Sequence, residues 1–267
     1  MNHYIQIIRP SVCVLSILGI IVGGIVTGVI FNPLIILAAI AAFLITGAGN
    51  VINDYFDFEI DKTNAPSRPI PSGRMERKRA LQYFLLINII GLAISFLVNW
   101  QFFVIAIVNT IVLYVYSWKF KKALLIGNIA VSWLAASTFI AAGLISQSLP
   151  ISIIVLSLIS FLGTLSREIV KDIEDVKGDR QYKAKTLPIV IGEHKSEIIA
   201  SIVLLVAVIS LFVPITLFSN FYFIGMVPAV VVCIAAIIYI KNAHKSQKLI
   251  KFAMYFVFLG FILGSVL

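Results

Sequence analysis

The sequence predicts an all-α membrane protein with nine transmembrane helices, and two observations carry this prediction. Of the 267 residues, 60% are hydrophobic and only 12% are charged, whereas a soluble domain carries about 25% charged residues. Apolar runs near the length of about 20 residues that crosses a bilayer also recur along the whole chain. We therefore expect one membrane domain over residues 1–267, with spans at 11–30, 34–52, 80–98, 102–118, 124–144, 151–169, 197–218, 221–240 and 249–266.

The distribution of charged residues agrees with nine spans. Nine spans place the connections alternately on two sides, and the connections of one side contain no Lys, Arg, Asp or Glu. Lys and Arg mark the cytoplasmic side of a membrane protein. We therefore expect a protein of the cell membrane whose cytoplasmic segments are 1–10, 53–79, 119–123, 170–196 and 241–248.

Charge and cysteine content narrow the classes of function. The net charge of +9 fits an anionic lipid leaflet and an anionic substrate. Nucleic-acid binding is not indicated because the chain has no separate basic domain, and no protein partner is implied. Cys13 and Cys233 lie in apolar runs and the three histidines are isolated, so a zinc site is not expected.

Two acidic motifs of identical spacing follow the second and the sixth span. Asp54, Asp57 and Asp61 recur 118 positions later, and Asn50, one turn earlier, corresponds to Glu168; the second set is Asp172, Asp175 and Asp179. Steps of three and four residues place side chains on one face of a helix. Each motif is therefore expected to present a stripe of oxygen ligands, called here the first and the second stripe.

Carboxylates that share a helix face repel one another, and carrying them beside a bilayer adds a desolvation cost. A hard divalent cation removes both problems, because Mg²⁺ takes oxygen ligands and bridges carboxylates to phosphate oxygens. Two facing stripes could hold two or more Mg²⁺ on one diphosphate and stabilise it as a leaving group. The basic residues we expect to complete such a site are Arg9, Arg68, Lys121 and Lys171.

The duplicated motif also indicates an internal repeat. Its halves would be about 1–122 and 123–248, each with four spans, and the ninth helix at 249–266 would be additional.

At these residues the sequence resembles the UbiA superfamily of intramembrane prenyltransferases. Asn53-Asp54-x-x-Asp57-x-x-x-Asp61 is similar to its first motif and Asp175-x-x-x-Asp179, preceded by Asp172, to its second. Tyr116 with Lys121 is similar to its tyrosine–lysine motif, with a spacing one residue longer. The resemblance implies nine helices around a central lipid-open cavity with a cytoplasmic cap. It implies catalytic aspartates and Mg²⁺ ligands among Asn50, Asp54, Asp57, Asp61, Asp172, Asp175 and Asp179, and substrate contacts from Asn53, Arg68, Tyr116, Lys121, Lys171 and Arg9.

Three stretches are similar to one archaeal branch of that superfamily: residues 8–13, 61–73, and 172–179 with 186–188. That branch joins geranylgeranyl diphosphate to geranylgeranylglyceryl phosphate in ether-lipid synthesis. The resemblance thus implies a prenyl diphosphate donor and a lipid-phosphate acceptor, whose phosphate Arg68 or Arg9 would contact.

Two alternatives remain open. The acceptor could be an aromatic ring, as in quinone, haem or chlorophyll synthesis. A secondary transporter or Mg²⁺ channel is a different class, and internal repeats favour it. Transporters place ionisable groups near the bilayer midplane, however, and the third to fifth and seventh to ninth spans carry none there.

Overall fold

The computed structural model describes residues 2–120, 123–147, 149–181 and 184–267, and these residues form helices and loops without a strand. The helices are α1 His3–Ile8, α2 Pro10–Val26, α3 Leu34–Phe56, α4 Phe58–Asn64, α5 Arg77–Val98, α6 Trp100–Trp118, α7 Ile126–Ile145, α8 Ile151–Gln181, α9 Leu187–Ile191, α10 Glu193–Ser210, the 3₁₀ turn η2 Val213–Thr216, α11 Tyr222–Ile238 and α12 Ala243–Val266.

Each of the nine expected spans coincides with one helix. Seven helices are long and apolar enough to cross a membrane, whereas α2 and α11 are apolar but have 17 residues each. The all-α membrane fold is therefore confirmed, and the count of nine crossings stays a prediction. Two helices end before the expected spans do. The helix α2 ends before residue 30 because Gly28 has a left-handed backbone, with φ +71°. The helix α10 ends before residue 218 because Pro214 lies in the turn η2.

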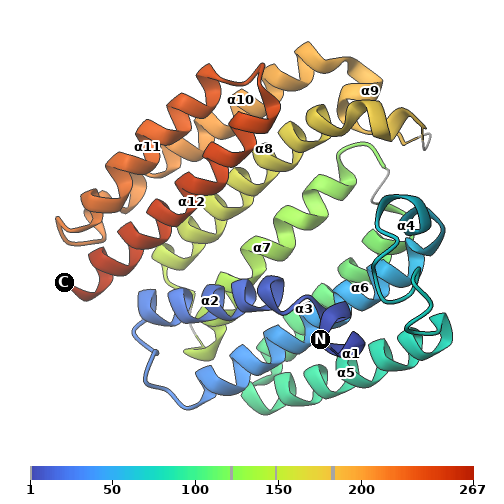
Figure 1. Ribbon diagram of the computed structural model, residues 1–267. Coiled ribbons are helices and arrows are strands. Elements are labelled where there is room, and N and C mark those ends of the chain that lie inside the picture. Colours follow the sequence, from blue (N-terminus) through green and yellow to red (C-terminus); the bar gives the residue numbers. More distant parts are fainter. Residues whose placement is uncertain (1, 121–122, 148, 182–183) are drawn as a thin grey trace.

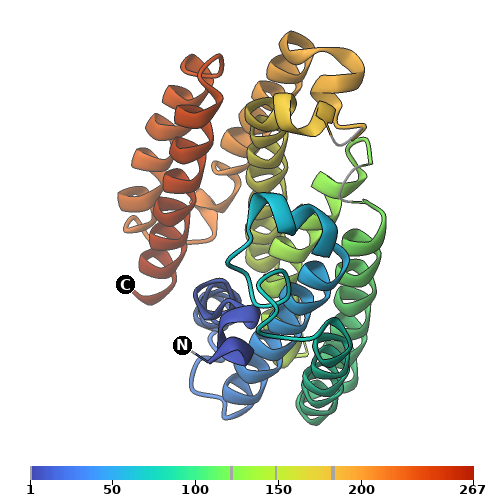
Figure 2. The same cartoon turned by 45° about the vertical axis from the view of Figure 1, so that its right-hand side comes forward.

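The helices form two groups that meet at α7 and α8 (Figures 1 and 2). On one side α2, α3, α5 and α6 pack together. On the other side α10 and α12 pack against α8, and α11 packs against α12. The hairpin of α11 and α12 is close, since a Cβ at Gly225 would lie 2.2 Å from the backbone nitrogen of Gly260. Such small residues let helices approach in a membrane, where apolar burial gives no driving force.

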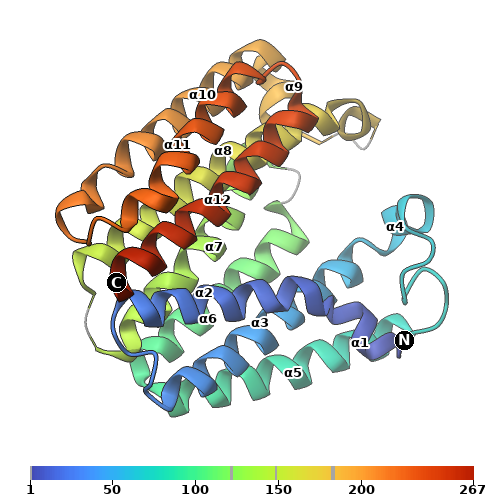
Figure 3. The ribbon, with the colours of Figure 1, turned by 60° about the vertical axis from the view of Figure 1, so that its left-hand side comes forward.

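One end of the bundle collects the polar segments. The helix α4, the last turns of α8 and the helix α9 lie at this end, together with the N-terminus, and the C-terminus lies at the opposite end (Figure 3). Termini on opposite ends are what an odd number of crossings requires. The two stripes therefore lie at the same end of the molecule.

Candidate functional site

The first stripe lies where α3 passes into α4. Its three aspartates are buried, with 1%, 6% and 4% exposure for Asp54, Asp57 and Asp61. The expectation of one unbroken helix is wrong here, because α3 ends at Phe56 and α4 begins at Phe58. Asp57 is the bend, a position that suits aspartate since its side chain competes for backbone hydrogen bonds. Backbone hydrogen bonds of helical spacing nevertheless run from Asp57 N to Asn53 O and from Asp61 N to Asp57 O, at 2.9 and 2.8 Å. The three aspartates therefore still lie on one face across the bend.

Two arginines from outside these helices cover the first stripe. Arg9, in the link between α1 and α2, pairs with Asp54. Arg68, in the loop after α4, lies 2.5 Å from Asp61 and 3.4 Å from Asp54. Arg9 also has φ 51°, a left-handed conformation that is rare for a residue other than glycine and is found where surrounding structure enforces it. The structure thus places both predicted arginines on the carboxylates.

Two asparagines of α3 are tied to their neighbours. The amide nitrogen of Asn50 donates to the backbone oxygen of Ile8 at 2.8 Å, which connects α3 to the end of α1. The amide nitrogen of Asn53 donates to Asp57 at 2.9 Å. The Asn50 amide therefore holds the end of α1, next to Arg9, and the Asn53 amide holds the carboxylate of Asp57.

The second stripe lies on the last turns of α8. The membrane span expected over 151–169 lies within α8, and the helix continues to Gln181, as the helical spacing of the motif predicts. Polar residues of helical spacing can prolong a helix beyond the membrane, where hydropathy no longer marks it. In contrast to the first stripe, Asp172 is half-buried and Asp175 is exposed.

Asp172 receives a hydrogen bond from a neighbouring helix. The amide nitrogen of Asn128, in the first turn of α7, donates to Asp172 Oδ2 at 2.8 Å. Asn128 is 7% exposed, and a buried amide needs such partners. The carboxylate that corresponds to Asp54 is thus held by a neutral group.

The cations beside the second stripe lie on α8 itself. Arg167 and Lys171 contact Glu168, with nitrogen–oxygen distances of 2.7 and 3.4 Å. Lys171 also lies within electrostatic range of Asp172 and Asp175. The predicted lysine is therefore part of the second stripe's own helix.

Tyr116 is a side chain that the charges of both stripes influence. This side chain of α6 lies within electrostatic range of Asp57 in the first stripe and of Glu168 and Asp172 in the second. Asp179 likewise acts on Asp172. Lys121 lies outside the described residues.

The donor atoms fit Mg²⁺. They are hard carboxylate oxygens, and the described residues contain no group of three or more His, Cys, Asp or Glu side chains close enough to hold an ion by themselves. Mg²⁺ is usually bound through one or two carboxylates together with substrate phosphates and water. A site that is completed by a diphosphate agrees with this arrangement.

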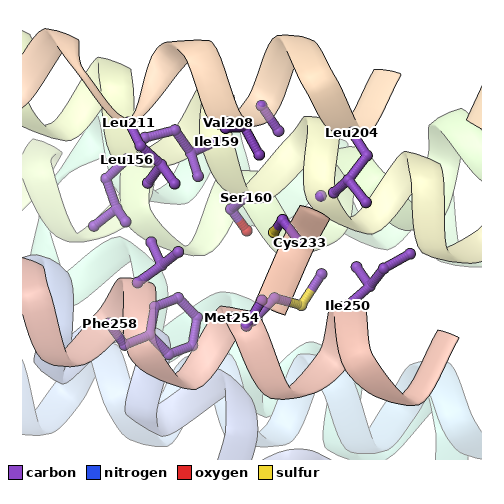
Figure 4. Close-up of a pocket in the computed structure, with 14 residues that line it drawn as sticks. Leu156, Ile159, Ser160, Leu204, Val208, Leu211, Cys233, Ile250, Met254 and Phe258 are labelled. Atoms are coloured by element: carbon purple, nitrogen blue, oxygen red, sulfur yellow. The ribbon is translucent and has the colours of Figure 1, made fainter. Parts of the chain in front are cut away.

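A cavity of about 470 Å³ lies between α6, α7 and α8. Its walls are apolar, and Ile111, Ile126 and Ile129 are 56%, 46% and 42% exposed, so the cavity opens sideways to lipid. This cavity lies between three helices, and the central cavity with a cytoplasmic cap that the resemblance implies stays a prediction. A second cavity, between α8, α10, α11 and α12, has only about 30 Å³ (Figure 4), which is room for little more than a water molecule.

Sequence reasoning missed Asn128 and Arg167. Arg167 adjoins Glu168 at the end of the expected sixth span, and its position beside an acidic residue is the only signal in the sequence. Asn128 lies 118 positions after Pro10, next to the position that corresponds to Arg9. The repeat could therefore have indicated that this polar residue faces the second stripe.

The fold and these two stripes define a membrane-embedded prenyltransferase. Residues 14–262 match the UbiA prenyltransferase family, and the chain belongs to this family.

Digeranylgeranylglyceryl phosphate synthase from Methanosphaera stadtmanae is 37% identical over 278 aligned residues, which cover 100% of both chains. A solved structure concerned with digeranylgeranylglyceryl phosphate synthase in membranes has a TM-score of 0.89 at 34% identity and covers 99% of this chain and 98% of its own. A UbiA homologue from Archaeoglobus fulgidus bound to GPP and Mg²⁺ has a TM-score of 0.75, 17% identity and coverage of 99% and 100%. That last likeness concerns the fold.

Proposed function

We propose that this chain transfers a geranylgeranyl group from geranylgeranyl diphosphate to the free hydroxyl of geranylgeranylglyceryl phosphate, in a reaction that depends on Mg²⁺. The observation that carries the proposal is the pair of acidic stripes at one end of a membrane bundle, in a chain similar over its full length to digeranylgeranylglyceryl phosphate synthases. The aromatic acceptor is the alternative that the assay below tests.

We assign the metal site to Asn50, Asp54, Asp57 and Asp61 of the first stripe and Asp172, Asp175 and Asp179 of the second. When bound, two or more Mg²⁺ would neutralise charge on the departing diphosphate. Asn53, Tyr116, Lys121 and Lys171 would contact the donor around these carboxylates. Arg9 and Arg68 would supply positive charge to a phosphate group at the first stripe.

The prenyl chain would lie in the cavity between α6, α7 and α8. The cavity reaches the part of α6 next to Tyr116, since Val115 and Phe120 line it. Volumes of 300–1,000 Å³ are usual for ligand pockets. An apolar chain there would extend from the diphosphate toward the lipid-exposed side.

The reaction would exchange one carbon–oxygen bond for another. The allylic C–O bond breaks, and diphosphate leaves with the electron pair. The hydroxyl oxygen of the acceptor forms the new ether bond and releases its proton. Aromatic faces favour nearby positive charge, and Tyr116 is an aromatic side chain within electrostatic range of both stripes.

An assay of purified protein tests this function. Labelled geranylgeranyl diphosphate and Mg²⁺ should give a labelled ether with geranylgeranylglyceryl phosphate, and EDTA should abolish the product. A free glycerol phosphoester should inhibit by competing with the acceptor. Prenylation of 4-hydroxybenzoate in place of the lipid phosphate would assign the aromatic acceptor, and full activity in EDTA would exclude the metal mechanism.

We also propose that both stripes face the cytoplasm. The charged connections and the stripes lie at one end, and Lys and Arg mark the cytoplasmic side. Single cysteines at Asn32, Gln147 or Asn220, introduced without the buried Cys13 and Cys233, should react with impermeant reagents only from outside the cell. A cysteine at Ser72 should react only after the membrane is opened. The reverse labelling would overturn the orientation.

A further inference from the structure

We propose that Asn128 is a positioning residue that orients Asp172 for Mg²⁺, and that the second stripe is where metal binds first; this inference rests on the proposed function. The spacing of the aspartates does not distinguish the two stripes, because it is identical. The distinction comes from what contacts the first aspartate of each.

The contacts of Asn128 and Arg9 are equivalent. Arg9 reaches Asp54 across 45 positions, and Asn128 reaches Asp172 across 44. Both lie at the start of the first helix of a repeat half, α2 or α7. The N-cap of each helix is also a left-handed residue other than glycine: Arg9 has φ 51° and Leu125 has φ 53°.

The two contacts differ in charge. A guanidinium on Asp54 neutralises the carboxylate and competes with a cation for its oxygens. The amide on Asp172 adds no positive charge and, among the described residues, is a hydrogen-bond partner of Oδ2 and not of Oδ1. The carboxylate therefore keeps Oδ1 for a metal, in a fixed orientation. Groups that fix a metal ligand in this way raise metal affinity, and their loss typically costs 10- to 100-fold.

Accessibility points the same way. The first stripe is buried beneath Arg9 and Arg68, whereas Asp172 is half-buried and Asp175 is exposed. An ion that arrives without substrate would reach Asp172 and Asp175 without displacing an arginine that, among the described residues, pairs with either carboxylate. The first stripe would take metal when the diphosphate provides anionic oxygens for the two arginines.

Mn²⁺ titration without substrate tests this inference. Mn²⁺ takes the place of Mg²⁺, and the free ion is counted by electron paramagnetic resonance with purified full-length protein in detergent. Asn128→Ala should weaken the tightest Mn²⁺ site by about 10- to 100-fold. Asn128→Leu keeps the side-chain size without the donor and should do the same, so the test stands if one variant fails to fold. In turnover, both variants should recover when Mg²⁺ is raised, which loss of a merely structural contact would not allow.

Ser132→Ala is the matched control. Ser132 is buried one turn along α7 and bonds to the backbone oxygen of Asn128 at 2.6 Å, so its loss disturbs the same helix without touching Asp172. Mn²⁺ affinity should stay within twofold of the unaltered protein. Unchanged affinity in folded Asn128 variants would overturn the role of Asn128, while failure of the unaltered protein to bind Mn²⁺ would instead contradict the proposed metal dependence.

Discussion

The two stripes have the same spacing of aspartates but opposite arrangements of charge. In the first stripe a cation from outside α3 and α4, Arg9, pairs with Asp54. The partner on the same helix is neutral, since Asn53 donates a hydrogen bond to Asp57. In the second stripe the outside partner is the neutral Asn128, and the cation within the helix is Lys171. Asn53 and Lys171 occupy corresponding positions, 118 residues apart.

This comparison teaches that a duplicated motif does not imply duplicated electrostatics. Unpaired charges are costly to bury, so the buried first stripe is compensated by guanidinium groups. The second stripe is more open to water, and the cation near Asp172 and Asp175 is Lys171 of the same helix. The site is therefore asymmetric in charge, although the spacing of its aspartates repeats. Three predictions test whether this asymmetry affects activity and stability.

The largest expected effect is removal of one carboxylate charge from either stripe. Asp54→Asn and Asp172→Asn should each reduce kcat by on the order of 10³-fold, because metal stabilisation of a leaving group is worth several kcal/mol and each 1.36 kcal/mol is tenfold. The double variant should be little worse, as for groups that act as a unit. Single-turnover assays with saturating donor measure this, and multiplied losses in the double variant would mean that the stripes act independently.

A smaller effect is expected from the two arginines. Arg68→Ala should reduce kcat/KM for the donor by about 10- to 150-fold, the equivalent of 1.5–3 kcal/mol for a hydrogen bond to a charged group. Arg9→Ala should lie in the same range. Steady-state kinetics in each substrate separately distinguishes the two phosphate groups.

Arg74→Ala is the control for these arginines. Arg74 bonds to Ser72, at 2.9 Å, and to the backbone oxygen of Ser67 in the same loop, away from the carboxylates, so it should change kcat/KM by less than about threefold. The structure places Arg68 on Asp54 and Asp61, so we expect the donor to be affected more. A larger rise in KM for the acceptor would instead support the sequence-based expectation that Arg68 contacts the acceptor's phosphate.

The smallest effect concerns a surface ion pair beside each stripe. His244 of α12 lies 2.7 Å from Glu174 of α8, and Lys62 lies 2.9 Å from Glu59 in α4. Pairs this exposed contribute at most about 1 kcal/mol. His244→Ala and Glu59→Ala should therefore lower the unfolding free energy by less than that and leave kcat within twofold. A strong loss of activity in one variant alone would show that its stripe depends on the surface pair.

The sequence by itself determined the class of fold, because the local content of hydrophobic residues sets the free energy of exposing a segment to lipid. Hydropathy placed a helix at each of nine spans, and steps of three and four residues placed the aspartates on helix faces. The family resemblance followed from the same residues. The exact ends of α2, α8 and α10 did not follow, since a Gly turn, a polar helix extension and a Pro turn decide them without changing hydropathy.

Only the tertiary structure decided which groups meet the aspartates. Arg9 and Asn128 lie 45 and 44 positions from their partners, and nothing local to either residue specifies such a contact. It results from the packing of α3 on the α1–α2 link and of α8 on α7. Burial of the first stripe beneath two arginines, and exposure of the second, follow from the same packing, because the cost of desolvating a carboxylate depends on what covers it.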